Sequence, residues 1–166
     1  MNNRATGVLV VHSAPRAISS HVEWAVNAIV GVPLRYRWKP SHLVDDAVRV
    51  EVYWDAPIGS AAKIASTLRG WTDLRFEITE DAGPAGLGIR IAHTPSLGLN
   101  AVSFDAGGSL VVTEHQIESI LQGAGGDLTA VRDGFDRALG GAWERELEPF
   151  RAARYDSSVR LLRGVG

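Results

Sequence analysis

Two stretches of this chain follow the same order of strand, Ala-Pro pair, helix, glycine and second strand. The first pair is Ala14-Pro15 and the second is Ala56-Pro57. After its helix and glycine, each copy continues into a strand that begins Leu-Arg-aromatic, at residues 34–36 and 74–76. Two βαβ units in tandem give β-α-β-β-α-β, and right-handed crossovers place both helices on one face of an antiparallel sheet. The repeat therefore predicts a ferredoxin-like βαββαβ sandwich.

Hydrophobic periodicity supports the same order of elements. Residues 8–11 are apolar on both faces, as in a covered central strand, and the segment after Pro15 has the repeat of a helix. Strict alternation of apolar and polar residues predicts half-buried strands before and after a second, short helix. The predicted elements are a strand at 8–11, a helix at 18–30, a strand at 34–38 that forms a hairpin with 48–54, a helix at 60–68 and a strand at 74–78.

The second half predicts a further hairpin followed by helices. Alternation predicts strands at 87–94 and 99–104 with a partner at 110–112, and Thr113 and Gln116 have the spacing of a helix capping box. Asp127 is placed to cap the next helix, 143–150 adds a turn or two, and the tail 157–165 forms a short strand or a docked strap. We expect one α+β domain over 1–166, with a ferredoxin-like half at 5–80. The half at 86–166 would cover the helix face that carries Trp24.

The junction between the first strand and the first helix is the strongest candidate for a binding site. His12 ends the strand, Ser13 follows it, and Arg16 lies at the helix entry. The first amides of a helix and an arginine fork both attract anions, so these three residues are candidate ligands of a phosphate or carboxylate. The glycines of a phosphate-binding loop are missing. The structural alternative, which we weigh above the functional one, is that Ser13 caps the helix and His12 is a satisfied strand-end histidine.

The sequence contains no set of residues whose spacing identifies a catalytic or metal centre. His21 and Glu23 are two residues apart and point to different sides of a helix, whereas zinc needs three or four converging ligands. His12 polarised by Glu23 would be a general base only if tertiary folding joined them. We expect no metal and no cofactor, and the sequence leaves enzymatic activity undecided while favouring a non-enzymatic role.

Charged residues alternate along the predicted strands and line the sheet face that the two helices leave open. Cross-strand ion pairs on a solvated face are the first interpretation, a docked protein partner the second, and RNA a distant third because stacking aromatic residues are missing. Tryptophan and arginine also mark interaction hot spots, and 140–151 is the best candidate docking segment, with Trp143, Phe150 and Arg151. The charged residues of the sheet face are Arg35, Arg37, Arg49, Glu51, Arg75, Glu77 and Arg90.

Composition limits the class of partner and the compartment. A net charge of −2 argues against a dedicated nucleic-acid binder, whose affinity comes mainly from neutralised phosphates. The chain has no cysteine, and no apolar run approaches the roughly 20 residues that cross a bilayer. The N-terminus lacks the apolar core of a signal peptide. We expect a cytoplasmic protein that neither crosses nor binds a membrane.

Four motifs carry a resemblance that extends over nearly the whole chain. They are VVHSAPRA at 10–17, HVEWAV at 21–26, LRGW with LRFE at 68–77, and ELEPFR at 146–151. With them the chain resembles an uncharacterised actinobacterial family, domain of unknown function 3145. The resemblance implies a cytoplasmic protein without an assigned activity, whose genes lie near those for fatty-acid synthesis. It also implies an aspartate in the turn at 94–98, where this chain has Ser96, which argues against an acidic role there.

Two hypotheses of function follow. The leading one is a non-enzymatic accessory, regulatory or assembly subunit that docks on a larger enzyme complex, such as acyl-CoA carboxylase or the fatty-acid synthesis machinery. It rests on the tryptophans, the missing catalytic set and the resemblance, and adds His21, Glu23 and Trp24 to the candidate interface. The alternative is a small enzyme or ligand-binding protein that holds a phosphate or CoA-type anion at the strand–helix junction.

Overall fold

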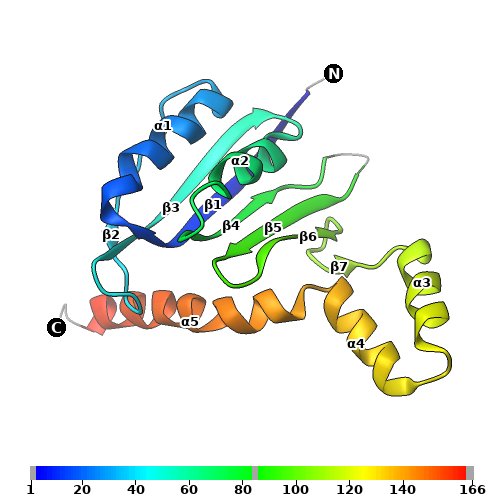
Figure 1. Cartoon of the computed structure of the whole chain (residues 1–166). Coiled ribbons are helices and arrows are strands. Elements are labelled where there is room, and N and C mark those ends of the chain that lie inside the picture. The colour runs from blue at the N-terminus through cyan, green and yellow to red at the C-terminus, as the bar shows by residue number, and fades with distance from the viewer. Residues whose placement is uncertain (1–2, 84–85, 164–166) are drawn as a thin grey trace.

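The computed structural model describes residues 3–83 and 86–163, with side chains up to residue 154, and is built around one antiparallel sheet (Figure 1). In the described part, the sheet has the strand order β2-β3-β1-β4-β5-β6-β7. The strands are β1 (Arg4–Pro15), β2 (Lys39–Pro40), β3 (Ala47–Pro57), β4 (Arg75–Glu80), β5 (Gly88–Thr94), β6 (Gly98–Phe104) and β7 (Leu110–Val111). The helices are α1 (Ser19–Val30), α2 (Ser60–Leu68), α3 (Glu114–Ala124), α4 (Leu128–Ala138) and α5 (Gly141–Arg163), with a 3-10 turn at Arg16–Ile18.

The predicted α+β class is confirmed. Strands of the first half stand in the order β2-β3-β1-β4, and α1 and α2 lie together on one face of them. Strand β4 pairs with β5, so the sheet continues without interruption into the second half of the chain. The narrower ferredoxin-like assignment stays a prediction, because the second strand of that pattern is reduced to two residues.

The hydrophobic core lies between the sheet and the two helices α1 and α2. Strand β3 shows how the sequence selects this face, because side chains of successive strand residues point to opposite sides. Val50, Val52 and Trp54 are buried in the core, whereas Glu51 and Tyr53 between them point to the opposite face. The strictly alternating sequence therefore gives the sheet one apolar and one polar face.

The first strand is longer than predicted and the second is shorter. Strand β1 continues through Ser13 to Pro15, and α1 begins only after the 3-10 turn. Ser13 therefore does not cap α1, whose N-cap position is Ile18 without a side-chain hydrogen bond. The predicted strand at 34–38 is extended chain outside the sheet, and pairing with β3 begins at Lys39.

Helix α1, rather than a strand partner, holds the segment 34–38. Oδ1 of Asn27 accepts hydrogen bonds of 3.0 Å from the backbone N–H of Leu34 and from the hydroxyl of Tyr36. Oε1 of Glu23 accepts one of 2.7 Å from the indole N–H of Trp38. The three apolar side chains of the segment pack against the edge of the core. Side-chain acceptors on the helix thus fix a segment that the sequence pattern assigns to the sheet.

Helices α3 and α4 form a hairpin at the β7 end of the sheet (Figure 1). Both predicted caps are confirmed, with a capping box at Thr113 and a hydrogen bond from the backbone N–H of Thr129 to Asp127. Ile120 of α3 packs so closely on Gly134 of α4 that a Cβ on this glycine would lie 2.6 Å from the Ile120 side chain. Helix α3 contacts mainly α4, so the hairpin projects from the sheet.

The C-terminal helix differs most from the prediction. Helix α5 has 23 residues and replaces both the short helix at 143–150 and the predicted strand or strap at 157–165, of which 164 and 165 lie outside the described residues. It crosses the sheet face opposite α1 and α2 (Figure 1). The expectation that the second half covers Trp24 is therefore wrong, and Trp24 is 74% exposed. The physical reason is that α5 presents charged residues, which match the polar face of the sheet. No helix in the described part of the chain is long and apolar enough to cross a membrane.

Candidate functional site

His12 follows the core residue Val11 in β1, so its side chain lies on the polar face of the sheet, at a β-bulge. The pairing of β1 with β3 shifts register between Val11 and Ala14, and its pairing with β4 shifts between Val11 and Ser13. A bulge inserts an extra residue into one strand and redirects the side chains beside it. His12 is buried and its ring lies 6.0 Å from the ring of Phe150 in α5. The C-terminal helix thus covers the strand end of the predicted strand–helix junction.

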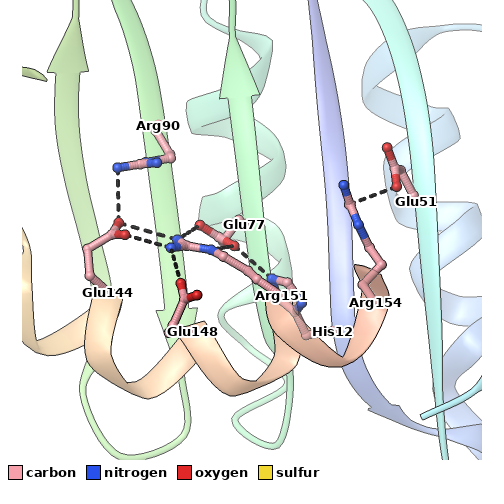
Figure 2. A network of polar contacts seen from close by, with 8 residues as sticks. All are labelled: His12, Glu51, Glu77, Arg90, Glu144, Glu148, Arg151 and Arg154. Carbon is pink, nitrogen blue, oxygen red and sulfur yellow. Dashed lines mark hydrogen bonds and ion pairs between the residues drawn. The ribbon is translucent and has the colours of Figure 1, made fainter. Parts of the chain in front are cut away.

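Glu77 of β4 is the centre of an ionic cluster beneath α5, which we define as His12, Glu77, Arg90, Glu144 and Arg151 (Figure 2). Nε2 of His12 lies 2.7 Å from Oε2 of Glu77. Nε of Arg151 donates to the same carboxylate oxygen at 3.0 Å, and Nη2 of Arg151 donates to Oε1. One buried carboxylate therefore joins β1, β4 and α5.

Helix α5 contacts the strands in their order across the sheet. Its Glu144 pairs with Arg90 of β5 at 2.9 Å and also accepts from Arg151 at 2.6 Å, while Arg151 itself reaches Glu77 of β4. One turn further along, Arg154 pairs with Glu51 of β3 at 2.8 Å (Figure 2). These positions lie on one side of a helix because they are spaced by three or seven residues. The charges of the polar sheet face are therefore paired mainly with a helix of the same chain, and His12 with Glu77 adds a pair between the neighbouring strands β1 and β4.

Electrostatics keep the centre of this cluster charged. Burial alone would raise the pKa of Glu77, but hydrogen bonds from His12 and Arg151, and the charges of these two groups, lower it to about 2. The hydrogen bond to Glu77 raises the pKa of Arg151 above its ordinary value, in spite of burial. Charge-assisted hydrogen bonds thus compensate for the removal of both groups from water.

Aromatic residues close the site on either side of the cluster. The guanidinium of Arg75 lies 5.3 Å from the centre of the Phe150 ring, and its Nη1 is 3.4 Å from the hydroxyl of Ser13. The indole N–H of Trp143 donates to the backbone carbonyl of Gly98 at 2.9 Å. The candidate docking segment 140–151 therefore contacts the sheet of its own chain, and Phe150 and Trp143 are used in that contact.

The structure separates the other residues that the sequence singles out. Arg16, His21 and Trp24 are exposed, whereas His12 and Ser13 are buried. Glu23 accepts the indole N–H of Trp38 and does not reach the cluster. The structure therefore does not place the predicted anion ligands around a shared opening.

The arrangement is chemically suited to fastening a helix to a sheet. Each ionisable group of the cluster is engaged by another member, and the described residues contain no group of three or more His, Asp or Glu that could hold a metal ion. Sequence reasoning did not identify Glu77 and Glu144 as partners of Arg151, nor Arg90 as a partner of Glu144. The available signal was the spacing of charges in 144–154, which puts both signs on one helix face opposite a charged sheet face.

The comparisons with known proteins identify a family but no activity. Residues 8–164 match the family described as a protein of unknown function (DUF3145). No curated protein and no solved structure matches the chain.

Proposed function

We propose, from the premise that this chain belongs to the DUF3145 family, that it is a non-enzymatic accessory subunit that docks on a larger enzyme complex. The observation that carries the proposal is the α3–α4 hairpin, which projects from the sheet and exposes apolar side chains. The exposed large apolar residues of this hairpin are Ile117, Leu121 and Leu128.

Helix α3 has little role in the core of the protein. Only Ala124 among its residues is buried, and Ile120 makes its packing contact with α4. Ile117 and Leu121 are one helical turn apart, so they lie on one side of α3, and Leu121 is 52% exposed. Leu128 at the start of α4 is 78% exposed. Apolar side chains presented together on a projecting element are typical of surfaces that bind another protein.

The bonding and burial of the polar groups beneath α5 support an accessory role and not catalysis. The histidine and carboxylate best placed for proton transfer, His12 and Glu77, bond to each other under α5, and Glu77 also accepts hydrogen bonds from Arg151. A general base has to reach the proton that it abstracts, and this pair is covered. The resemblance to a family with genes near those of fatty-acid synthesis favours acyl-lipid enzymes as the docking partner.

The proposal is tested by affinity purification of tagged protein from its host, with mass spectrometry of the proteins retained. The wild-type chain is expected to retain defined subunits of a larger complex. The double variant Leu121→Ser and Leu128→Ser is expected to retain about tenfold less of these subunits, since hot-spot side chains dominate binding energy. Its unfolding midpoint should stay close to that of the wild type, because both side chains are exposed.

Leu87→Ser is the matched control, because Leu87 is a leucine outside the hairpin that is exposed to nearly the same extent as Leu121. It should retain the same subunits as the wild type. Recovery of the wild-type protein alone and monomeric would contradict the proposal, as would equal losses in the control and the hairpin variant.

A further inference from the structure

We propose that the protein has a second docking surface, formed by Arg35, Arg37, Lys39 and Trp24, which binds an acidic extended segment of a partner protein. We call the three cations the basic strip. This surface lies on the segment held by α1 and is separate from the α3–α4 hairpin in the chain and in the fold (Figure 1).

The basic strip has an excess of positive charge that its own chain does not neutralise. From Trp24 to Val44 the sequence contains the three cations and no acidic residue. All three are exposed, and within the described residues their side chains form no hydrogen bond and no ion pair. Arg90 of β5 and Arg151 of α5, in contrast, are paired with carboxylates. Charge complementarity therefore points to an acidic partner.

The backbone of the strip is already extended before any partner arrives. Leu34, Tyr36 and Trp38 point inward and are fixed by Asn27 and Glu23 of α1, so the cations between and after them all point outward. Alternate residues of an extended chain are about 7 Å apart, which is also the spacing of alternate carboxylates along a partner in β conformation. A surface held in its binding conformation loses little entropy on association.

Trp24 adds an apolar contact beside the strip. Trp24 lies next to Glu23 and three residues before Asn27, the two residues of α1 that accept hydrogen bonds from the segment 34–38. It is therefore on the side of α1 beside this segment. Nothing in the core requires this indole, because it is 74% exposed. Tryptophan and arginine are the side chains most enriched at the centres of protein interfaces.

The charge of the whole molecule favours an acidic protein segment over a long polyanion. Nucleic acids and anionic membranes present many phosphates, and their affinity grows with the number of cations that neutralise them. Here the strip supplies three cations on a chain whose net charge is −2. A short acidic segment with an apolar residue for Trp24 matches this surface.

The experiment measures fluorescence anisotropy of a labelled peptide, in which aspartate alternates with valine, on addition of the full-length protein at low salt. The double variant Arg35→Glu and Arg37→Glu is expected to weaken binding at least about tenfold, because it replaces attraction by repulsion. Trp24→Ala should weaken it by about threefold or more, with an unchanged unfolding midpoint. Lys63→Glu with Arg69→Glu is the matched control at exposed cations of another surface and should leave affinity unchanged.

Three outcomes would overturn the proposal. The first is no peptide binding, or an equal loss of binding in the control variant. The second is equal binding of a peptide with the same composition and its aspartates in one block, which would contradict the extended geometry. The third is strip-dependent binding of phosphatidylglycerol vesicles or oligothymidine without binding of the peptide, which would assign the surface to another class of partner. Hairpin variants should bind the peptide normally, so failure here is distinct from failure of the proposed function.

Discussion

Glu77 and Gly7 show how single residues on β1 and β4 limit what the fold tolerates. The Glu77 carboxylate is bonded to a histidine of β1 and an arginine of α5, so it stays charged while buried. Gly7 lies where the Trp54 ring crosses β1, and a Cβ there would be 2.5 Å from the ring and 1.9 Å from the carbonyl oxygen of Thr79. Both positions depend on contacts with residues far away in the sequence.

Acid should destabilise the protein partly through Glu77. Its pKa is about 2 when folded, against 4.5 for a free glutamate. Its contribution is complete above pH 4.5 and is lost as the pH falls towards 2, because the unfolded chain takes up the proton first. Urea unfolding at a series of pH values should show that Glu77→Gln is less stable than the wild type at neutral pH. Between pH 4.5 and 2, the free energy of unfolding of the wild type should fall by up to roughly 3 kcal/mol more than that of the variant. Glu114→Gln on exposed α3 is the control and should follow the wild type. Identical pH dependence in Glu77→Gln and the wild type would contradict the role of this pair.

Gly7→Ala should destabilise the protein strongly. The added Cβ would overlap a backbone carbonyl and the Trp54 ring, neither of which can move without disturbing the sheet or the core. We expect a loss of about 3 kcal/mol or more in the free energy of unfolding, measured by urea denaturation. Gly83→Ala is the matched control, since a Cβ there would meet nothing within 4 Å. A comparable loss in both variants would contradict this explanation.

At the scale of elements, both charge and the buried aliphatic residue Leu147 fasten the described part of α5 to the sheet. Leu147 is fully buried, between the positions of Glu144 and Arg151 on the side of the helix that faces the sheet. The ion pairs select where the helix lies, because buried charges are costly unless paired. Leu147 stabilises the docked helix further, because its apolar surface is removed from water.

Leu147→Ala should lower the free energy of unfolding by about 2–4 kcal/mol, because the truncation leaves a cavity between α5 and the sheet. Amide hydrogen exchange should also become faster in α5 than in α2, since the variant loosens one docked element. Leu128→Ala, at a leucine that is 78% exposed, should change stability by less than about 0.5 kcal/mol. The account of α5 fails if the two variants are equally stable.

At the scale of the whole molecule, the sheet lies between an apolar layer and a charged one. Helices α1 and α2 cover one face through the hydrophobic core, and α5 crosses the other from β5 to β3. Because β4 and β5 belong to different halves of the chain, α5 ties both halves together. The coupling between Glu77 and Arg151 measures this connection.

A double-mutant cycle with Glu77→Gln and Arg151→Gln should give a coupling energy of about 1–3 kcal/mol from urea unfolding. The exposed pair Arg4 and Asp55, 2.8 Å apart, should give less than about 1 kcal/mol in the same cycle with Arg4→Gln and Asp55→Asn. High salt should reduce the exposed coupling more than the buried one, since salt screens exposed charges more effectively. Additive effects at Glu77 and Arg151 would show that α5 is not fastened by this pair.

Local patterns were sufficient for much of the architecture. Helix α2 occupies the predicted residues, the caps at Thr113 and Asp127 form, and alternation locates strands β3 to β6 within a few residues. These features depend on neighbours within one or two turns or on the two-residue period of a strand. The sequence by itself therefore determined the α+β class and the apolar face of the sheet.

Tertiary structure decided which polar groups meet. Glu77 is 65 residues from His12 and 74 from Arg151, and no periodicity encodes a contact over that distance. The segment 34–38, which was expected to be a strand, is held by hydrogen bonds to Asn27 and Glu23 and not by pairing in the sheet. Helix α5 packs on the charged face of the sheet and leaves the indole of Trp24 uncovered. The physical reason is that buried charges have to find partners wherever the chain brings them, whereas an exposed tryptophan can remain in water.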